Sequence, residues 1–181
     1  MAMGSADNRL RSACPGRFGT GQEADDSYGI TQCHRRSRTN ILRQRMIKVL
    51  WIALGGSLGA LLRHAVSSLA LRLAPPDVPW GTLAANLLGC FLIGALWVLA
   101  DRYSFSQEVR VFVFTGGIGS LTTFSTYGLE SLLLLREGRV LMGLGNILLS
   151  NVLGLALVAL GAACALLVLG ESVTAVAGMQ Q

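Results

Sequence analysis

Long apolar stretches dominate the chain from about residue 47 onwards. They cover approximately 47–70, 80–100, 111–135 and 140–169. Each is long enough to cross a bilayer as an α-helix, which takes about 20 residues. The last stretch is longer than a bilayer needs, so we expect it to tilt or to project from the membrane. The pattern predicts an all-α membrane protein with four transmembrane helices.

The third apolar stretch contains a segment that is poorly suited to a continuous helix. Its sequence from Thr115 to Tyr127 is TGGIGSLTTFSTY, and both glycine and small hydroxyl residues weaken a helix. Backbone that leaves the helix at membrane depth is tolerated only where it is buried in protein, lines a water-filled path or holds an ion. We therefore predict that the third helix is broken mid-membrane and that the break is a transport site.

Residues 1–45 differ in composition from the rest of the chain. They are rich in Arg, Ser, Gly, Asp and Gln, and they show no apolar periodicity. Such a composition cannot bury enough surface to fold. We therefore expect 1–45 to be a disordered basic tail or a mis-annotated start, with Met46 as the true first residue. The four-span domain would cover 46–170, followed by a C-terminal tail at 171–181.

The overall composition excludes an ordinary soluble domain. The chain is 52% hydrophobic and 14% charged, with a mean hydropathy of +0.54. Eight of the fifteen basic residues precede Met46, so the net charge of +5 belongs mostly to the tail and does not indicate nucleic-acid binding. The four cysteines have no metal-ligand spacing, and no enzyme motif is present. We predict that the protein is not an enzyme.

The loops between the four apolar stretches carry balanced positive charge. Without the tail, three basic residues lie on the side of the termini and three on the opposite side: Lys48, Arg102 and Arg110 against Arg72, Arg136 and Arg139. Orientation normally follows an excess of Lys and Arg on one side. The balance therefore suggests insertion in both orientations and pairing as an antiparallel homodimer, although such small counts also arise by chance.

The few polar groups within the apolar stretches favour an anion path. No Asp or Glu lies deep in any stretch, whereas a proton-coupled pump usually needs a membrane carboxylate. Arg63 lies in the first stretch without an acidic neighbour, which suggests an aqueous vestibule with a positive potential. The alternative is an arginine whose side chain extends to the membrane surface.

Uncharged donors lie in the other three stretches. Asn86 is the only amide of the second stretch, and its NH₂ group could donate to an anion. Phe124 and Tyr127 have rings with positive edges that could face an anion. A polar face on the fourth stretch could line a path, and it consists of Asn146, Ser150 and Gly154. The alternatives are hydrogen bonds between helices for the amides and core packing for the rings.

Together these residues resemble the CrcB/Fluc family of fluoride channels. The resemblance covers Met46 to about Gly170, and four features carry it. They are GGSLGALLR at 55–63, GTLAANLLG at 81–89, GGIGSLTTFST at 116–126, and the face formed by Asn146, Ser150 and Gly154. The glycine-broken segment with Thr-Thr-Phe-Ser-Thr is the most specific of the four. The family implies a passive channel that exports toxic cytoplasmic fluoride.

The resemblance also implies roles for individual pore residues. Asn86 would be the pore amide, and Phe124 and Tyr127 would present ring edges to fluoride. Arg63 would lie in the vestibule. Further polar side chains along the pore would be those of Thr123, Ser125, Thr126, Asn146 and Ser150. The sequence departs from the family at two of these positions, with Tyr127 where Phe is usual and Asn146 where some members have Tyr.

The family further implies how the chain assembles. Its members are dual-topology homodimers with two pores in the cell inner (plasma) membrane, so the partners would be a second copy, the lipid bilayer and fluoride. The backbone carbonyls of Gly119 and Thr122 would bind a structural Na⁺ at the dimer axis. The main alternative function is a small dual-topology multidrug or cation exporter, but this would need a glutamate in the first stretch, which has none. A non-transporting structural membrane protein is a third possibility.

Overall fold

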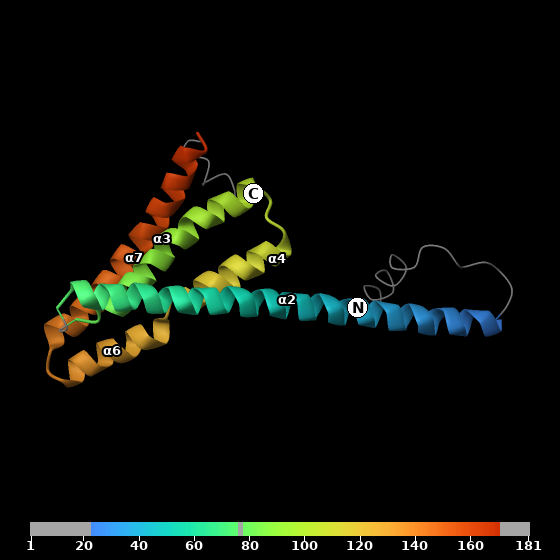
Figure 1. Ribbon diagram of the computed structural model, residues 1–181, viewed down its shortest axis with the longest axis horizontal. Coiled ribbons are helices and arrows are strands. Elements are labelled where there is room, and N and C mark those ends of the chain that lie inside the picture. Colours follow the sequence, from blue (N-terminus) through green and yellow to red (C-terminus); the bar gives the residue numbers. More distant parts are fainter. Residues whose placement is uncertain (1–22, 76–77, 171–181) are drawn as a thin grey trace, which may run out of the picture. The chain divides into compact units, whose positions relative to one another are not determined.

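All regular structure in the described residues is helical, which confirms the predicted all-α class (Figure 1). The computed structural model describes the backbone of residues 23–75 and 78–170, and side chains from residue 40 onwards. The elements are α2 (Glu23–Leu73), α3 (Trp80–Arg102), α4 (Gln107–Arg110), the π-helix η1 (Val111–Ile118), α5 (Gly119–Leu121), α6 (Phe124–Arg136) and α7 (Val140–Val168).

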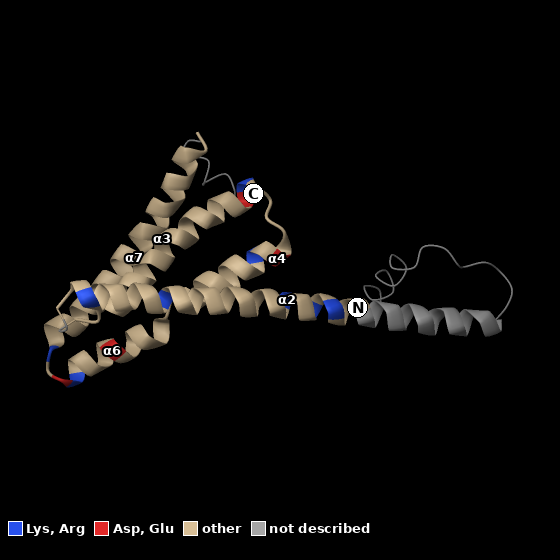
Figure 2. Cartoon of the chain, viewed as in Figure 1, with Lys and Arg blue, Asp and Glu red and all other residues tan. Residues whose placement is uncertain are grey.

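Within the described part of the chain, three helices are long and apolar enough to cross a membrane, judged by length and composition. They are Asn40–Leu73 within α2, together with α3 and α7. Both α3 and α7 begin at the predicted residue and end within two residues of the predicted end. In Figure 2, α7 carries no charged residue and α3 carries charges only at its C-terminal end. The chain is therefore a membrane protein.

The segment before Met46 is more helical than its composition predicts. The helix α2 begins at Glu23, whereas we expected no regular structure before residue 46. Residues 30–54 contain neither glycine nor proline, so nothing in the sequence stops the helix before the apolar stretch. The chain divides into two compact units, 1–48 and 49–181, close to the predicted boundary. Residues 1–22 and the predicted C-terminal tail at 171–181 lie outside the described residues.

Glycines bring α3 and α7 into close contact. A Cβ atom at Gly94 would collide with the carbonyl oxygen of Val158, and one at Gly161 would collide with that of Phe91. Helices that meet at small residues can bring their backbones together. Beside this crossing, the side chains of Val98 and Leu166 are almost completely buried and form a core cluster. The helices α3 and α7 thus form a tightly packed pair.

A second glycine crossing joins α2 to the π-helix η1. A Cβ atom at Gly55 would collide with the carbonyl oxygen of Phe112, and one at Gly59 with that of Gly117. Gly55 and Gly59 are four residues apart, a spacing of small residues that allows two helices to approach closely. Trp51 packs edge-on against Phe112 beside the crossing, with ring centroids 5.8 Å apart.

The region 107–136 is built from short pieces rather than one helix. The longest is α6, with 13 residues, and the chain leaves helical geometry between α5 and α6. Thr122 has φ −83° and ψ 151°, and Thr123 has φ −145° and ψ 109°, so both are extended. The sequence did not predict that the eight residues of η1 would form a π-helix.

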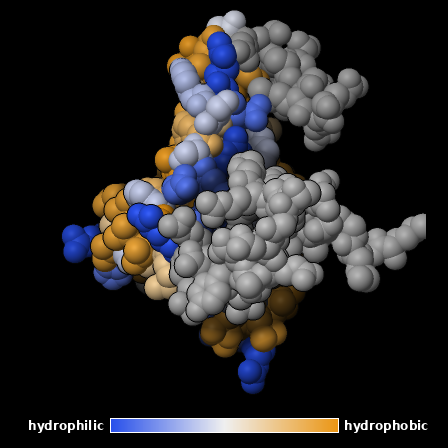
Figure 3. All heavy atoms as spheres, turned by 90° about the vertical axis from the view of Figure 1, so that its right-hand side faces the viewer, coloured by the Kyte–Doolittle hydropathy of each residue, from blue (hydrophilic) through white to orange (hydrophobic). Residues whose placement is uncertain are grey.

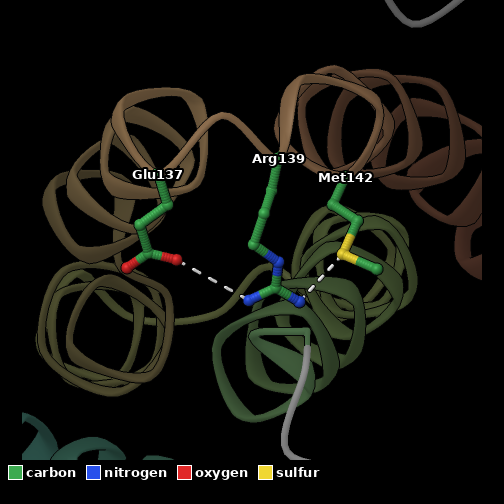
Figure 4. Close-up of polar contacts among 3 residues, drawn as sticks. All are labelled: Glu137, Arg139 and Met142. Atoms are coloured by element: carbon green, nitrogen blue, oxygen red, sulfur yellow. Dashed lines mark hydrogen bonds and ion pairs between the residues drawn. The ribbon is translucent and has the colours of Figure 1, made fainter.

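A tight turn joins α6 to α7 (Figure 4). Gly138 adopts a φ of +76°, which an L side chain rarely does. Nη1 of Arg139 lies 3.7 Å from Oε2 of Glu137, and its Nη2 lies 2.8 Å from the sulfur of Met142. An ion pair as exposed as this one contributes little to stability.

Apolar side chains cover much of the outer surface. Leu141 is 86% exposed and Leu155 is 75% exposed, both on α7. Hydrophobic side chains also reach the surface in several places in Figure 3. A surface of this kind is suited to lipid or to contact with another apolar surface.

We expect Gly59→Ala to destabilise the fold. Neither helix can accommodate the added methyl group, because the atom it meets is the backbone oxygen of Gly117. The free energy of unfolding should fall by about 1–3 kcal/mol or more, measured as a lower thermal midpoint in detergent. Gly145→Ala is the matched control, since a Cβ atom there meets nothing within 4 Å. It should leave the midpoint unchanged or raise it slightly, and equal effects of both changes would contradict the crossing.

Candidate functional site

The side chain of Asn86 satisfies the backbone at the break. Its Nδ2 donates to the carbonyl oxygen of Thr123 at 3.2 Å, and its Oδ1 accepts from the Thr123 N–H at 2.7 Å. The Asn86 amide thus replaces the helical acceptor that the Thr123 N–H loses, and it also bonds to the carbonyl of Thr123, which caps α6. This is the interhelical hydrogen bond that the sequence left open as an alternative. An Asn amide has two N–H donors, and the second one has no partner in the described part of the chain.

Three hydroxyl groups gather at the start of α6. Thr123 caps the helix, because its Oγ1 accepts from the Thr126 N–H at 3.3 Å. The same oxygen lies 2.9 Å from Oγ1 of Thr126 and 3.4 Å from Oγ of Ser125. The structure therefore brings together the three hydroxyls that the sequence predicted. They lie at the positive end of the α6 helix dipole, where an anion is favoured.

The two predicted aromatic residues pair on the first turn of α6. The ring centroids of Phe124 and Tyr127 are 5.4 Å apart and their planes are inclined by 52°. Phe124 is 81% exposed, whereas Tyr127 is only 9% exposed. The Tyr127 hydroxyl accepts a hydrogen bond of 2.9 Å from Nδ2 of Asn151 on α7. Asn151 is not one of the predicted site residues.

The predicted polar face of α7 divides into two kinds of contact. Asn146 is 4% exposed and donates from Nδ2 to Oγ of Ser131 at 2.9 Å, so it joins α7 to α6. Ser131 in turn donates to the carbonyl oxygen of Tyr127 at 2.8 Å. Oγ of Ser150 is buried and has no hydrogen-bond partner among the described residues. Gly154 faces Cys90 of α3.

A hydrogen bond between Thr82 and Glu130, neither of which was a predicted site residue, joins α3 to α6. Oγ1 of Thr82 donates to Oε1 of Glu130 on α6 at 2.8 Å. The other carboxylate oxygen of Glu130 is buried without a partner among the described residues. Thr82 lies one helical turn before Asn86 and therefore shares its face of α3. The four-residue spacing from Asn86 could have identified Thr82 as a site residue. Glu130 could have been identified because it is the only acidic residue within the third apolar stretch.

The backbone at the break also leaves carbonyl oxygens without helical partners. In a continuous helix the Gly119 carbonyl would accept from the Thr123 N–H, but that N–H donates to Asn86 instead. The extended backbone of Thr122 likewise takes its carbonyl out of the helical pattern. Hard cations prefer such oxygen ligands. These two carbonyls are therefore suited to a cation such as Na⁺.

Arg63 lies apart from these contacts. Its side chain is half-buried on α2, and no hydrogen bond or ion pair joins it to another residue in the described part of the chain. Gly89 of α3, in contrast, lies against the methyl group of Thr122. The structure thus brings Asn86, the three hydroxyls and the aromatic pair together at the break and joins Asn146 to α6, while no hydrogen bond among the described residues joins Ser150 or Arg63 to them.

The same stretch of chain matches a known family. The family described as "CrcB-like protein, Camphor Resistance (CrcB)" matches residues 50–162, which is more than half of the chain. The chain belongs to the CrcB family. The match includes every side chain of the site described above, and it begins shortly after the predicted boundary at Met46.

Curated CrcB relatives carry a common name. A protein of Salinibacter ruber is 75% identical over 130 residues, covering 72% of this chain and 98% of the relative. One from Parabacteroides distasonis is 42% identical over 128 residues, covering 71% and 96%. One from Nitrosococcus oceani is 44% identical over 115 residues, covering 63% and 92%. All three are named fluoride-specific ion channel FluC.

We expect Asn86→Leu to destabilise the break. Leucine fills the space but removes the two hydrogen bonds that the Asn86 amide makes to the N–H and the carbonyl of Thr123. The free energy of unfolding should fall by about 1–3 kcal/mol, measured as the thermal midpoint in detergent. Ser57→Ala is the control, because it removes an exposed hydrogen bond to a carbonyl of its own helix. A loss no larger than that of the control would show that Asn86 does not support the break.

Proposed function

We propose that this protein is a fluoride-selective ion channel that exports toxic cytoplasmic fluoride by passive conduction. The observation that carries the proposal is family membership, together with a relative that is 75% identical over 98% of its own length and is named for this activity. The CrcB family is a family of ion channels, so the protein is not an enzyme. The exporter alternative draws no support from these relatives.

The geometry around the break supports fluoride as the permeant ion. Fluoride is small and strongly hydrated, so a pore must replace its water with close donors and still release it. Asn86 has a spare N–H, and the hydroxyls of Thr123, Ser125 and Thr126 gather at a helix N-terminus. Phe124 offers an exposed ring edge. Ser150 and Asn146 extend the path along α7, and the half-buried Arg63 provides positive potential at the vestibule.

The four-span arrangement follows from treating 107–136 as one broken crossing. No single piece of this region is long enough to span a bilayer, but α4, η1, α5 and α6 in sequence are. A break at membrane depth requires that its backbone groups find partners within the protein. Asn86 supplies such partners at Thr123, which supports this arrangement.

The working unit is an antiparallel homodimer in the cell inner (plasma) membrane. The balanced basic residues of the loops support insertion in both orientations. Phe124 and Gly119 are exposed in the single chain although they belong to the site. A second copy would cover them and complete the pore.

A structural Na⁺ at the dimer axis would join the two copies. The carbonyl oxygens of Gly119 and Thr122 would hold it, since the break frees both from helical hydrogen bonding. When bound, the ion supplies a positive charge that cross-links the two breaks through oxygen ligands. It does not pass through the pore.

Fluoride efflux tests the proposed function directly. The full-length protein, reconstituted in liposomes loaded with fluoride, should release it rapidly when a potassium ionophore balances the charge. A fluoride electrode records the release. Chloride-loaded liposomes are the control and should release almost nothing. No fluoride release from correctly assembled protein would refute the proposal.

Asn86→Asp tests the role of the amide in the same assay. The change keeps the shape of the side chain but places a negative charge beside the Thr123 carbonyl and in the anion path. We expect fluoride efflux to fall to the level of empty liposomes. Undiminished efflux from this variant would exclude Asn86 as a pore residue, while leaving the channel activity itself intact.

Removal of Na⁺ tests the cation site. At constant ionic strength, replacing Na⁺ with N-methyl-D-glucamine should lower the thermal midpoint of the purified dimer, because a ligand that binds only the folded assembly stabilises it. Size-exclusion chromatography should show an increase in monomer. A midpoint that does not change with Na⁺ concentration would refute the site.

A further inference from the structure

A chain of hydrogen bonds fixes the direction in which Tyr127 can donate its proton. Nδ2 of Asn151 lies 2.7 Å from the carbonyl oxygen of Ile147 and 2.9 Å from the Tyr127 hydroxyl. A carbonyl oxygen only accepts hydrogen bonds, so the atom facing it must be the amide nitrogen. The same nitrogen then donates its second hydrogen to Tyr127. The phenol oxygen is therefore an acceptor, and its own proton must point elsewhere.

The phenol proton of Tyr127 has no acceptor among the described residues. The only hydrogen bond of its hydroxyl there is the one received from Asn151. Yet the side chain is 9% exposed, and α7 also contacts its other end, through Asn146 and Ser131 to the Tyr127 carbonyl. The Tyr127 residue is thus held at its hydroxyl and at its carbonyl. A largely buried hydroxyl rarely leaves its proton without an acceptor. The acceptor of this proton therefore lies outside the described residues.

We propose that Tyr127 donates this proton to the permeating anion and that Asn151 is the residue that positions it. The inference rests on the proposed channel function, and it adds a neutral hydrogen-bond donor to the pore. The Tyr127 ring pairs with Phe124 beside the hydroxyls at the start of α6, so the donor belongs to the same group of residues. The Ile147 carbonyl completes the arrangement by fixing the orientation of the Asn151 amide.

The two bonds of Asn151 can be separated experimentally. In Asn151→Ser, the shorter side chain can still donate to the Ile147 carbonyl of its own helix, but it cannot reach Tyr127. Tyr127→Phe keeps the ring and removes the phenol. The native protein, both single variants and the double variant are compared by fluoride efflux over a range of fluoride concentrations. Fitting the efflux rate against the fluoride concentration gives a half-saturating concentration and a maximal rate for each protein.

We expect both single variants to conduct fluoride, because the ring edges and Asn86 remain. Each should raise the half-saturating fluoride concentration, by about tenfold for loss of a hydrogen bond to an anion. The double variant should resemble Tyr127→Phe alone, since Asn151 acts only through the phenol. Asn151→Gln keeps an amide donor and should restore part of the native value.

Any other outcome contradicts the proposed role of Asn151, that of the Tyr127 phenol or the channel function itself. A native half-saturating fluoride concentration in Asn151→Ser would refute the positioning role. So would a double variant in which the increases of the two single variants multiply. A fall in dimer stability with unchanged saturation would assign the phenol proton to the second copy instead. If Asn151→Ser fails to assemble, an unchanged half-saturating concentration in Tyr127→Phe refutes the proposal by itself. Absence of fluoride efflux from the native protein would refute the channel function, and this inference with it.

Discussion

The pairing of the Asn86 amide with the backbone of Thr123 is the interaction on which the site depends. A helix interrupted within a membrane leaves an N–H and a carbonyl that lipid cannot satisfy. The Asn86 side chain bonds to both backbone groups of Thr123, because a primary amide carries a donor as well as an acceptor. This pairing allows Thr122 and Thr123 to be extended, and the extension allows a new helix to begin at Phe124. The capping hydroxyls, the aromatic pair and the freed carbonyls all follow from that new start.

The site is polar but nearly free of formal charge. The acidic side chain of Glu130 lies at its edge, where it accepts a hydrogen bond from Thr82. Neutral donors suit an ion that must pass through, since they replace water without the strong attraction of a fixed cation. The same neutrality limits the cost of burying these groups in an apolar surrounding, where an unpaired charge would be far more expensive than a paired amide or hydroxyl.

Much of this arrangement could be predicted from the sequence, for identifiable reasons. Glycines and hydroxyls singled out residues 115–127, within which Thr122 and Thr123 are extended, and uninterrupted apolar runs predicted α3 and α7 almost to the residue. The hydrogen-bond partners of the site residues were harder to predict. Nothing local to Asn151 reveals that it reaches Tyr127, 24 residues away. The pairing of Thr82 with Glu130 likewise depends on how α3 packs against α6. The π-helix was not predictable either, because its wider turn has no compositional signature separate from that of the glycines.

The crossing of α2 and η1 has a mechanical consequence. At Gly55 and Gly59 the two helices meet through backbone atoms, with no side chain between them that could change rotamer. Such a joint has no side chain that can adjust, so any change in the distance between α2 and η1 would require one of the two backbones to move. The extended residues after Leu121, in contrast, are joined to their surroundings by hydrogen bonds that can stretch and re-form. The separation of α2 and η1 is therefore set by main-chain atoms, whereas the backbone after Leu121 is held in place by side-chain hydrogen bonds.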